Sequence, residues 1–177
     1  TPADDWFRLY TNEHWQTIVG SGALDKIIFG KEVARTFPTF SKMITTPDGD
    51  EFEVEFAAND FTANDNEIVL DNKPMVIILH GLEANAKGVQ VTRMTESFLQ
   101  QNFACVLVSF RSCNGQENKT IGAYHLGFTD DVDLLTKMLH KQYPNRPIYL
   151  AGFSLGGNVC LKFLGELGSK CKERNIY

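Results

Sequence analysis

The stretch YLAGFSLGGNVC, from Tyr149 to Cys160, decides the fold. Its apolar first half is typical of a buried strand and its second half begins a helix, so a sharp turn must join them. That turn is the run 152–156, GFSLG, which matches the pattern G-x-S-x-G. On a strand-to-helix turn this pattern presents a nucleophilic serine, whereas in an ordinary glycine-rich turn the serine has no chemical role. Because strand, glycines and helix agree, we favour Ser154 as a nucleophile.

The neighbours of Ser154 have expected roles of their own. We expect Gly152 and Gly156 to remove side chains that would crowd the serine in a tight elbow. The Leu155 N–H lies at the positive end of the following helix, so it is placed to donate a hydrogen bond to an oxyanion.

A second loop carries the other half of the expected oxyanion hole. The apolar run MVIIL ends at His80-Gly81-Leu82. In this architecture that loop lies beside the elbow, so we predict that the Leu82 N–H is the second donor. We expect the His80 side chain to be structural rather than a catalytic base.

The rest of the chain alternates between the two kinds of element. A hairpin is predicted around the turn Pro47–Asp50, followed by a polar surface loop over 58–73. Buried strands and amphipathic helices then alternate, which predicts an α/β fold with a mostly parallel sheet, an antiparallel N-terminal hairpin and helices on both faces. The strands are expected at 75–79, 103–110 and 148–153. One helix is expected at 88–101, a second begins at Thr129, whose hydroxyl caps it, and a third runs from 155 to about Gly165. We divide the chain into an N-terminal extension packed on the core, 1–38, and a main domain, 39–177.

Composition narrows the class of protein. The chain has 177 residues and a net charge of −5, which argues against nucleic acid as a partner. No apolar run approaches the ~18 residues that span a bilayer. The four cysteines lack zinc spacing, and Cys105 and Cys160 are expected to be small buried apolar residues. We therefore expect no metal and no cofactor.

The general base that Ser154 needs is not evident. No histidine or aspartate follows Leu155, although in α/β-type elbows the base and acid follow the serine. The candidates before it are His14, His80, His125 and His140. His125 lies near acidic residues at 130 and 131, but the interpretation that we favour is a local hydrogen bond beside a capped helix.

Several stretches together resemble the α/β-hydrolase superfamily, in particular the branch of YheT-type esterases, EMB8-like proteins and abhydrolase-domain 1 and 3 proteins. The similar stretches are NEHWQTI (12–18), TPDGDEFEVEF (46–56), ILHGLEAN (78–85), SFRSCNG (109–115), YHLGFTDDV (124–132) and GFSLGGN (152–158). Ala84 and Ser112 stand where the branch usually has glycine. The resemblance implies a serine hydrolase that cleaves carboxylic esters, with small-molecule, lipid or phospholipid acyl esters as substrates. It also implies that the aspartate and histidine lie on later strands, so that the covered chain is the N-terminal portion of the fold and is nearly inert alone.

A non-catalytic alternative stays open at this point. The chain could be a hydrolase-derived structural or assembly subunit, with a partner chain covering the sheet edge that the later strands would otherwise cover. The sequence leaves localisation open. We expect this fragment to be soluble, with organellar or membrane association possible through a segment before Thr1.

Overall fold

The computed structural model describes residues 34–59, 61–64, 67–70 and 73–177. From Arg35 onward the described residues form one compact unit. The predicted N-terminal extension over 1–38 falls almost entirely outside the described residues, so its boundary and its packing stay predictions. No helix among the described residues is long and apolar enough to cross a membrane.

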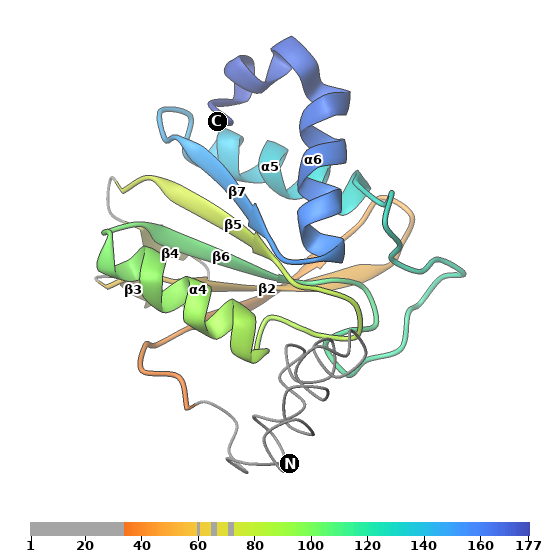
Figure 1. Ribbon diagram of the computed structural model, residues 1–177, viewed down its shortest axis with the longest axis horizontal. Coiled ribbons are helices and arrows are strands. Elements are labelled where there is room, and N and C mark those ends of the chain that lie inside the picture. Colours follow the sequence, from red (N-terminus) through yellow and green to blue (C-terminus); the bar gives the residue numbers. More distant parts are fainter. Residues whose placement is uncertain (1–33, 60, 65–66, 71–72) are drawn as a thin grey trace, which may run out of the picture. The chain divides into compact units, whose positions relative to one another are not determined.

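A five-stranded mixed sheet forms the centre of this unit, in the order β1-β2-β6-β5-β7 (Figure 1). The strands are β1 (Phe40–Thr45), β2 (Glu51–Ala57), β5 (Met75–Leu79), β6 (Ala104–Ser109) and β7 (Ile148–Gly152). β2 pairs antiparallel with β1 on one side and with β6 on the other, whereas β5 pairs parallel with both β6 and β7. The predicted α/β class, with its N-terminal hairpin, is confirmed.

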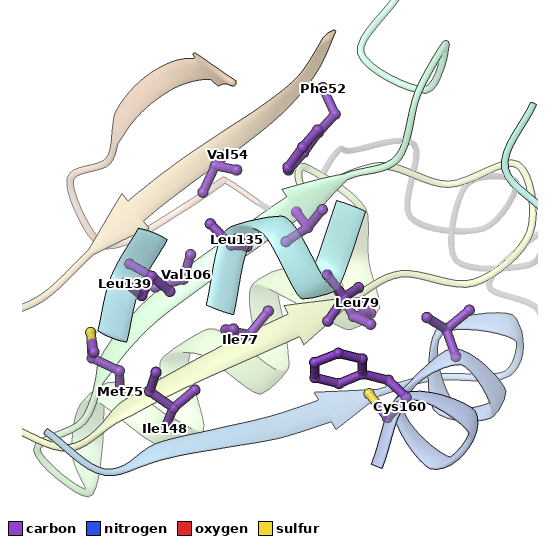
Figure 2. Packing of buried hydrophobic residues seen from close by; sticks show 14 of the residues in the cluster. Phe52, Val54, Met75, Ile77, Leu79, Val106, Leu135, Leu139, Ile148 and Cys160 are labelled. Carbon is purple, nitrogen blue, oxygen red and sulfur yellow. The ribbon is translucent and has the colours of Figure 1, made fainter. Parts of the chain in front are cut away.

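Helices cover both faces of the sheet, as predicted. They are α4 (Val89–Gln100), α5 (Asp130–Gln142) and α6 (Leu155–Leu167), followed by the 3-10 helix η1 (Gly168–Arg174). Alternate residues of β5 face opposite sides: Ile77 packs in the cluster with α5 and α6, and Ile78 packs in the cluster with α4. Figure 2 shows Ile77 in the cluster that also holds Leu135 and Leu139 of α5. Burial on both faces explains why β5 and β6 are continuous apolar runs.

The predicted surface loop over 58–73 is wrong in part, because a second hairpin lies there. It consists of β3 (Phe61–Asn64) and β4 (Glu67–Leu70), which pair antiparallel from Phe61 opposite Leu70 to Asn64 opposite Glu67. The many Asn and Asp residues favoured a loop, but the run Ile68–Leu70 has strand-forming side chains that outweigh them.

Details of β7 and α6 also differ from the prediction. Within β7 only Ile148 is buried. Ile148 forms a parallel bridge with Ile176 and backbone hydrogen bonds with Asn175 and Tyr177, whereas no strand in the described part of the chain pairs with the outer side of β7. Helix α6 continues past Gly165 and ends at Leu167, where Gly168 takes a φ of 52°. The Thr129 hydroxyl does not cap α5; it donates to Glu166 of α6 at 2.6 Å.

A buried arginine ties three segments together. Arg111, which follows β6, donates to Asp131 at the start of α5 through both Nε and Nη2, at 3.0 and 2.7 Å. Its Nη1 donates to Asp48 in the β1–β2 turn at 2.5 Å. The side chains of Arg111 and Asp131 are 4% and 2% exposed. The hydrogen bonds to Asp131 raise the pKa of Arg111, and the hydrogen bond from Arg111 lowers the pKa of Asp48 to about 2.

Replacing Arg111 by lysine should therefore destabilise the fold. One ammonium cannot reproduce donors that point in two directions, so Asp131 would be left buried without its paired hydrogen bonds. We expect Arg111→Lys to lower the free energy of unfolding by about 2–3 kcal/mol. Lys137→Ala, which removes an exposed ion pair with Asp133, is the matched control and should cost less than about 0.5 kcal/mol. Equal losses in urea titrations of the two variants would contradict this view of Arg111.

Candidate active site

Three strands end at the same edge of the sheet. In the parallel register Leu79 of β5 lies opposite Val108 of β6 and Gly152 of β7. The segments that follow these residues therefore emerge side by side. Ligands of open α/β sheets bind outside the carboxyl ends of the strands. The fold thus brings the His80-Gly81-Leu82 loop to the serine turn, although Ser154 lies 72 positions after Leu82 in the sequence.

The turn at Ser154 is sharp and strained. Its φ and ψ are 53° and −115°, and α6 begins at the next residue. A positive φ outside glycine costs about 1–3 kcal/mol and persists only where the surrounding structure imposes it. Ser154 is exposed, whereas Leu155 and Gly156 are buried. The predicted elbow geometry is present, with the serine side chain accessible to solvent.

The two elbow glycines permit close backbone contacts. A Cβ at Gly156 would lie 2.3 Å from the Leu79 carbonyl oxygen, and a Cβ at Gly152 would lie 2.4 Å from the Gly156 carbonyl carbon. We expected these glycines to relieve crowding around the serine itself. In the structure they let the first turn of α6 pack directly on the ends of β5 and β7, and their effect on crowding around the serine stays a prediction.

The predicted oxyanion loop does lie beside the serine. A Cβ built at Gly81 would be 3.5 Å from the Ser154 Cβ and 3.2 Å from Cδ1 of Phe153. Among the described residues, the Leu82 and Leu155 N–H groups donate no hydrogen bond to another backbone group. Their roles as oxyanion donors stay predictions.

Contacts that sequence reasoning missed hold this loop in place. The Tyr124 hydroxyl accepts the Glu83 N–H at 3.0 Å, and the Ser109 hydroxyl accepts the Ala86 N–H at 3.0 Å. Arg35 donates to the Ala86 carbonyl at 2.5 Å and also pairs with buried Glu55. Glu83 has a φ of 54°, so the strained residue in this loop is the one before Ala84.

The second position where glycine was expected behaves differently from Ala84. Ser112 has a φ of 59°, in the left-handed region that favours glycine. A glycine, which the resemblance implies at this position, would adopt this conformation without strain. The Ser112 hydroxyl donates to the Arg111 carbonyl at 2.6 Å, which is a local bond within the strained turn.

His80 is buried within the site and makes two hydrogen bonds. Its side chain is 1% exposed. Nε2 accepts the Phe110 N–H at 3.0 Å, and Nδ1 lies 2.6 Å from the Gly81 carbonyl oxygen. The ring packs edge-on to Phe110 and Tyr124, with centroids 4.7 and 6.1 Å away. A ring so enclosed has no path to a substrate proton, which agrees with the structural role expected for His80.

The other histidines do not complete a catalytic pair in the described part of the chain. His125 is exposed, and its Nδ1 accepts the Gly127 N–H at 3.1 Å, which is the local hydrogen bond that we expected. His140 lies in the last turn of α5 and is half-buried. His14 lies outside the described residues. Cys105 and Cys160 are buried as predicted, and burial raises their pKa values to about 12 and 11.

The close contact at Gly156 leads to a stability prediction. Gly156→Ala places a methyl group against the Leu79 carbonyl, so the elbow must open. We expect a loss of at least about 3 kcal/mol in the free energy of unfolding, the scale of severe overpacking. Gly165→Ala is the matched control on the same helix, because a Cβ there meets nothing within 4 Å. That change should stabilise the protein by about 0.5–1 kcal/mol. If Gly156→Ala left the free energy of unfolding unchanged, α6 could not pack as closely on the end of β5 as this contact requires.

The burial of His80 predicts a pH dependence of stability. Burial lowers the pKa of His80 from its ordinary value of 6.5. Below about pH 6.5 the unfolded chain therefore binds a proton that the folded chain refuses, so the free energy of unfolding falls as the pH drops. Tyr124, the titratable side chain against the ring, has its pKa raised by burial and does not titrate in this range. We expect His80→Asn to remove this component between about pH 5 and 7, measured by urea titration. If the free energy of unfolding of His80→Asn depended on pH as that of the wild type does, a neutral buried ring at His80 would be contradicted.

Comparison with known proteins agrees with the fold. The family described as the alpha/beta hydrolase fold matches residues 74–173, which are more than half of the chain. YheT of Escherichia coli (strain K12), a protein named as an esterase, is 26% identical over 162 residues, covering 92% of this chain and 43% of YheT. Phospholipase ABHD3 of Mus musculus is 27% identical over 132 residues, covering 73% of this chain and 31% of that protein.

A solved structure shares the same arrangement. The esterase Pf2001 of Pyrococcus furiosus superposes with a TM-score of 0.57 at 24% identity, covering 75% of this chain and 49% of that one. At this identity the likeness shows the fold. The chain spans less than half the length of the curated relatives described above. From the family match and the mixed sheet with its strand-to-helix serine turn, we conclude that the chain belongs to the α/β-hydrolase fold family.

Proposed function

We propose that the complete protein hydrolyses carboxylic esters through an acyl-enzyme on Ser154. The observation that carries the proposal is the elbow: an exposed serine with a φ of 53°, next to Gly81 and to two amides without a backbone acceptor. A backbone strained at one residue is typical of functional sites, where the surrounding structure imposes it. The esterase and phospholipase names of the relatives support the same chemistry.

The proposed reaction has two steps. The Ser154 Oγ attacks the ester carbonyl carbon while its proton passes to a histidine base, and the carbonyl oxygen becomes an oxyanion. The Leu82 and Leu155 N–H groups donate to that oxyanion. The histidine then protonates the leaving oxygen of the ester, the tetrahedral intermediate collapses and the alcohol is expelled. Water, deprotonated by the same base, attacks the acyl-serine. The bond from the carbonyl carbon to the Ser154 Oγ then breaks, the histidine returns its proton to the Oγ, and the carboxylic acid leaves. Each amide donor contributes roughly 10²–10³ in rate.

We further propose that the base and the acid are supplied from outside the printed sequence. Two observations support this. The exposed histidine His125 already accepts a hydrogen bond on Nδ1, and the relatives extend well beyond the matched region. In this family the acid and base follow the serine along the chain. The 177 residues alone would keep only the residual catalysis of about 10³–10⁴ over water that binding and an oxyanion hole provide.

Exposed apolar side chains beside the serine support an apolar acyl group in the substrate. Phe153 precedes Ser154 and is 48% exposed, and Leu82 in the neighbouring loop is 67% exposed. A fatty acyl chain would bury such surfaces at roughly 25 cal/mol per Å². A lipid or phospholipid ester therefore fits this site better than a small charged ester.

Labelling with a fluorophosphonate tests the proposal directly. We expect the complete protein to form one covalent adduct, located at Ser154 by peptide mass spectrometry, because only an activated serine attacks this phosphorus centre. Ser154→Ala should abolish both the label and the hydrolysis of p-nitrophenyl esters. Ser169→Ala, at an exposed serine in η1, is the matched control and should label as the wild type does.

The opposite result would favour the alternative function. If the folded complete protein takes up no label and cleaves no ester, the hydrolase proposal fails. A structural or assembly subunit, which keeps the elbow only for packing, would then be the better account.

A further inference from the structure

The direction of the Leu82 N–H is set by a neighbouring carbonyl. The Gly81 carbonyl and the Leu82 N–H belong to one peptide group, which is planar and trans, so they point in opposite directions. Whatever fixes the Gly81 oxygen therefore fixes the Leu82 hydrogen. His80 Nδ1 lies 2.6 Å from that oxygen.

The tautomer of His80 follows from its second contact. The Phe110 N–H donates to Nε2 at 3.0 Å, so Nε2 carries no proton. The proton of the neutral ring is then on Nδ1, where it is donated to the Gly81 carbonyl. Since Phe110 directly follows β6 and His80 directly follows β5, the ring links the ends of two adjacent strands.

We propose that His80, as the Nδ1–H tautomer, is a positioning residue that orients the Gly81–Leu82 peptide so that the Leu82 N–H faces the oxyanion formed at Ser154. This inference rests on the proposed function and deepens it. Gly81 already lies against Ser154, so a fixed peptide plane at this point determines where the donor aims. His80 never touches the substrate.

One other hydrogen bond restrains the same carbonyl. The Ala84 N–H donates to the Gly81 oxygen at 3.3 Å, and this bond survives any change at His80. Loss of the His80 contact therefore loosens the peptide without freeing it. The effect on rate should be smaller than the roughly 10²–10³ of deleting an oxyanion donor outright.

Two substitutions separate the two hydrogen bonds. In His80→Asn the side-chain amide nitrogen can occupy the place of Nδ1 and still donate to the Gly81 carbonyl, while the Phe110 N–H loses its acceptor. In His80→Gln the longer side chain can place its oxygen near Nε2 and still accept from Phe110, while the bond to Gly81 is lost. Each variant thus keeps one bond and loses the other.

Steady-state kinetics of the complete protein on a p-nitrophenyl ester test the proposal. We expect His80→Gln to lower kcat by about 10-fold or more with KM nearly unchanged, because the lost donor acts mainly in the transition state. His80→Asn should stay within about 3-fold of the wild type. Thermal unfolding of both variants shows whether either simply fails to fold. Equal losses in kcat, or losses that follow the melting temperature alone, would overturn the positioning role.

Nitrogen-15 NMR decides the geometry even if no ester is cleaved. The His80 ring should show a protonated Nδ1 and an unprotonated Nε2, and the Leu82 amide resonance should move in His80→Gln but not in His80→Asn. A ring protonated on Nε2, or a Leu82 resonance that is indifferent to both changes, would overturn the inference. An inert wild-type protein with the expected spectra would instead disprove the proposed function and leave the peptide orientation standing.

Discussion

The contact between the first turn of α6 and the end of β5 is the constraint on which the site depends. The Gly156 position lies so close to the Leu79 carbonyl that a Cβ would be 2.3 Å from its oxygen. Helix α6 can start this close to the sheet only if the chain turns within one residue, and that residue is Ser154, with its φ of 53°. The same contact brings the segment after Leu79 to the serine. The strain at Ser154 is therefore held by the packing of α6 on the ends of β5 and β7, which Gly152 and Gly156 permit.

Local sequence patterns predict those elements whose formation depends on neighbouring residues. The buried strands, the hairpin around Pro47–Asp50 and the elbow could be predicted because continuous apolar runs, turn residues and paired glycines each have a direct structural cause. The placement of β6 between β2 and β5 could not be predicted, because no residue in β6 encodes which strand lies beside it. The half-exposed β7 was misjudged for the same reason, since an apolar run does not show how many neighbours a strand has.

Buried polar contacts are the part of the site that sequence reasoning did not reach. Glu55 of β2 is fully buried and pairs with Arg35, a contact that nothing in the alternation of acids and apolar residues along β2 indicates. Arg111 joins carboxylates that are 20 and 63 residues away. Tyr124 supports a loop 41 residues before it. Such pairs depend on tertiary structure, and a single sequence gives no spacing rule for them.

In the proposed reaction, Ser154 faces the Leu82 and Leu155 amides, and these amides receive the negative charge of the reacting carbonyl oxygen. The most direct measurement is a crystal structure of the complete protein after phosphonylation, in which the phosphonyl oxygen stands in for the oxyanion. The account predicts a bond from the Ser154 Oγ to phosphorus, with the phosphonyl oxygen about 2.7–3.1 Å from the Leu82 and Leu155 nitrogens. A phosphonyl oxygen that points into solvent, or that is bound by other donors, would contradict it.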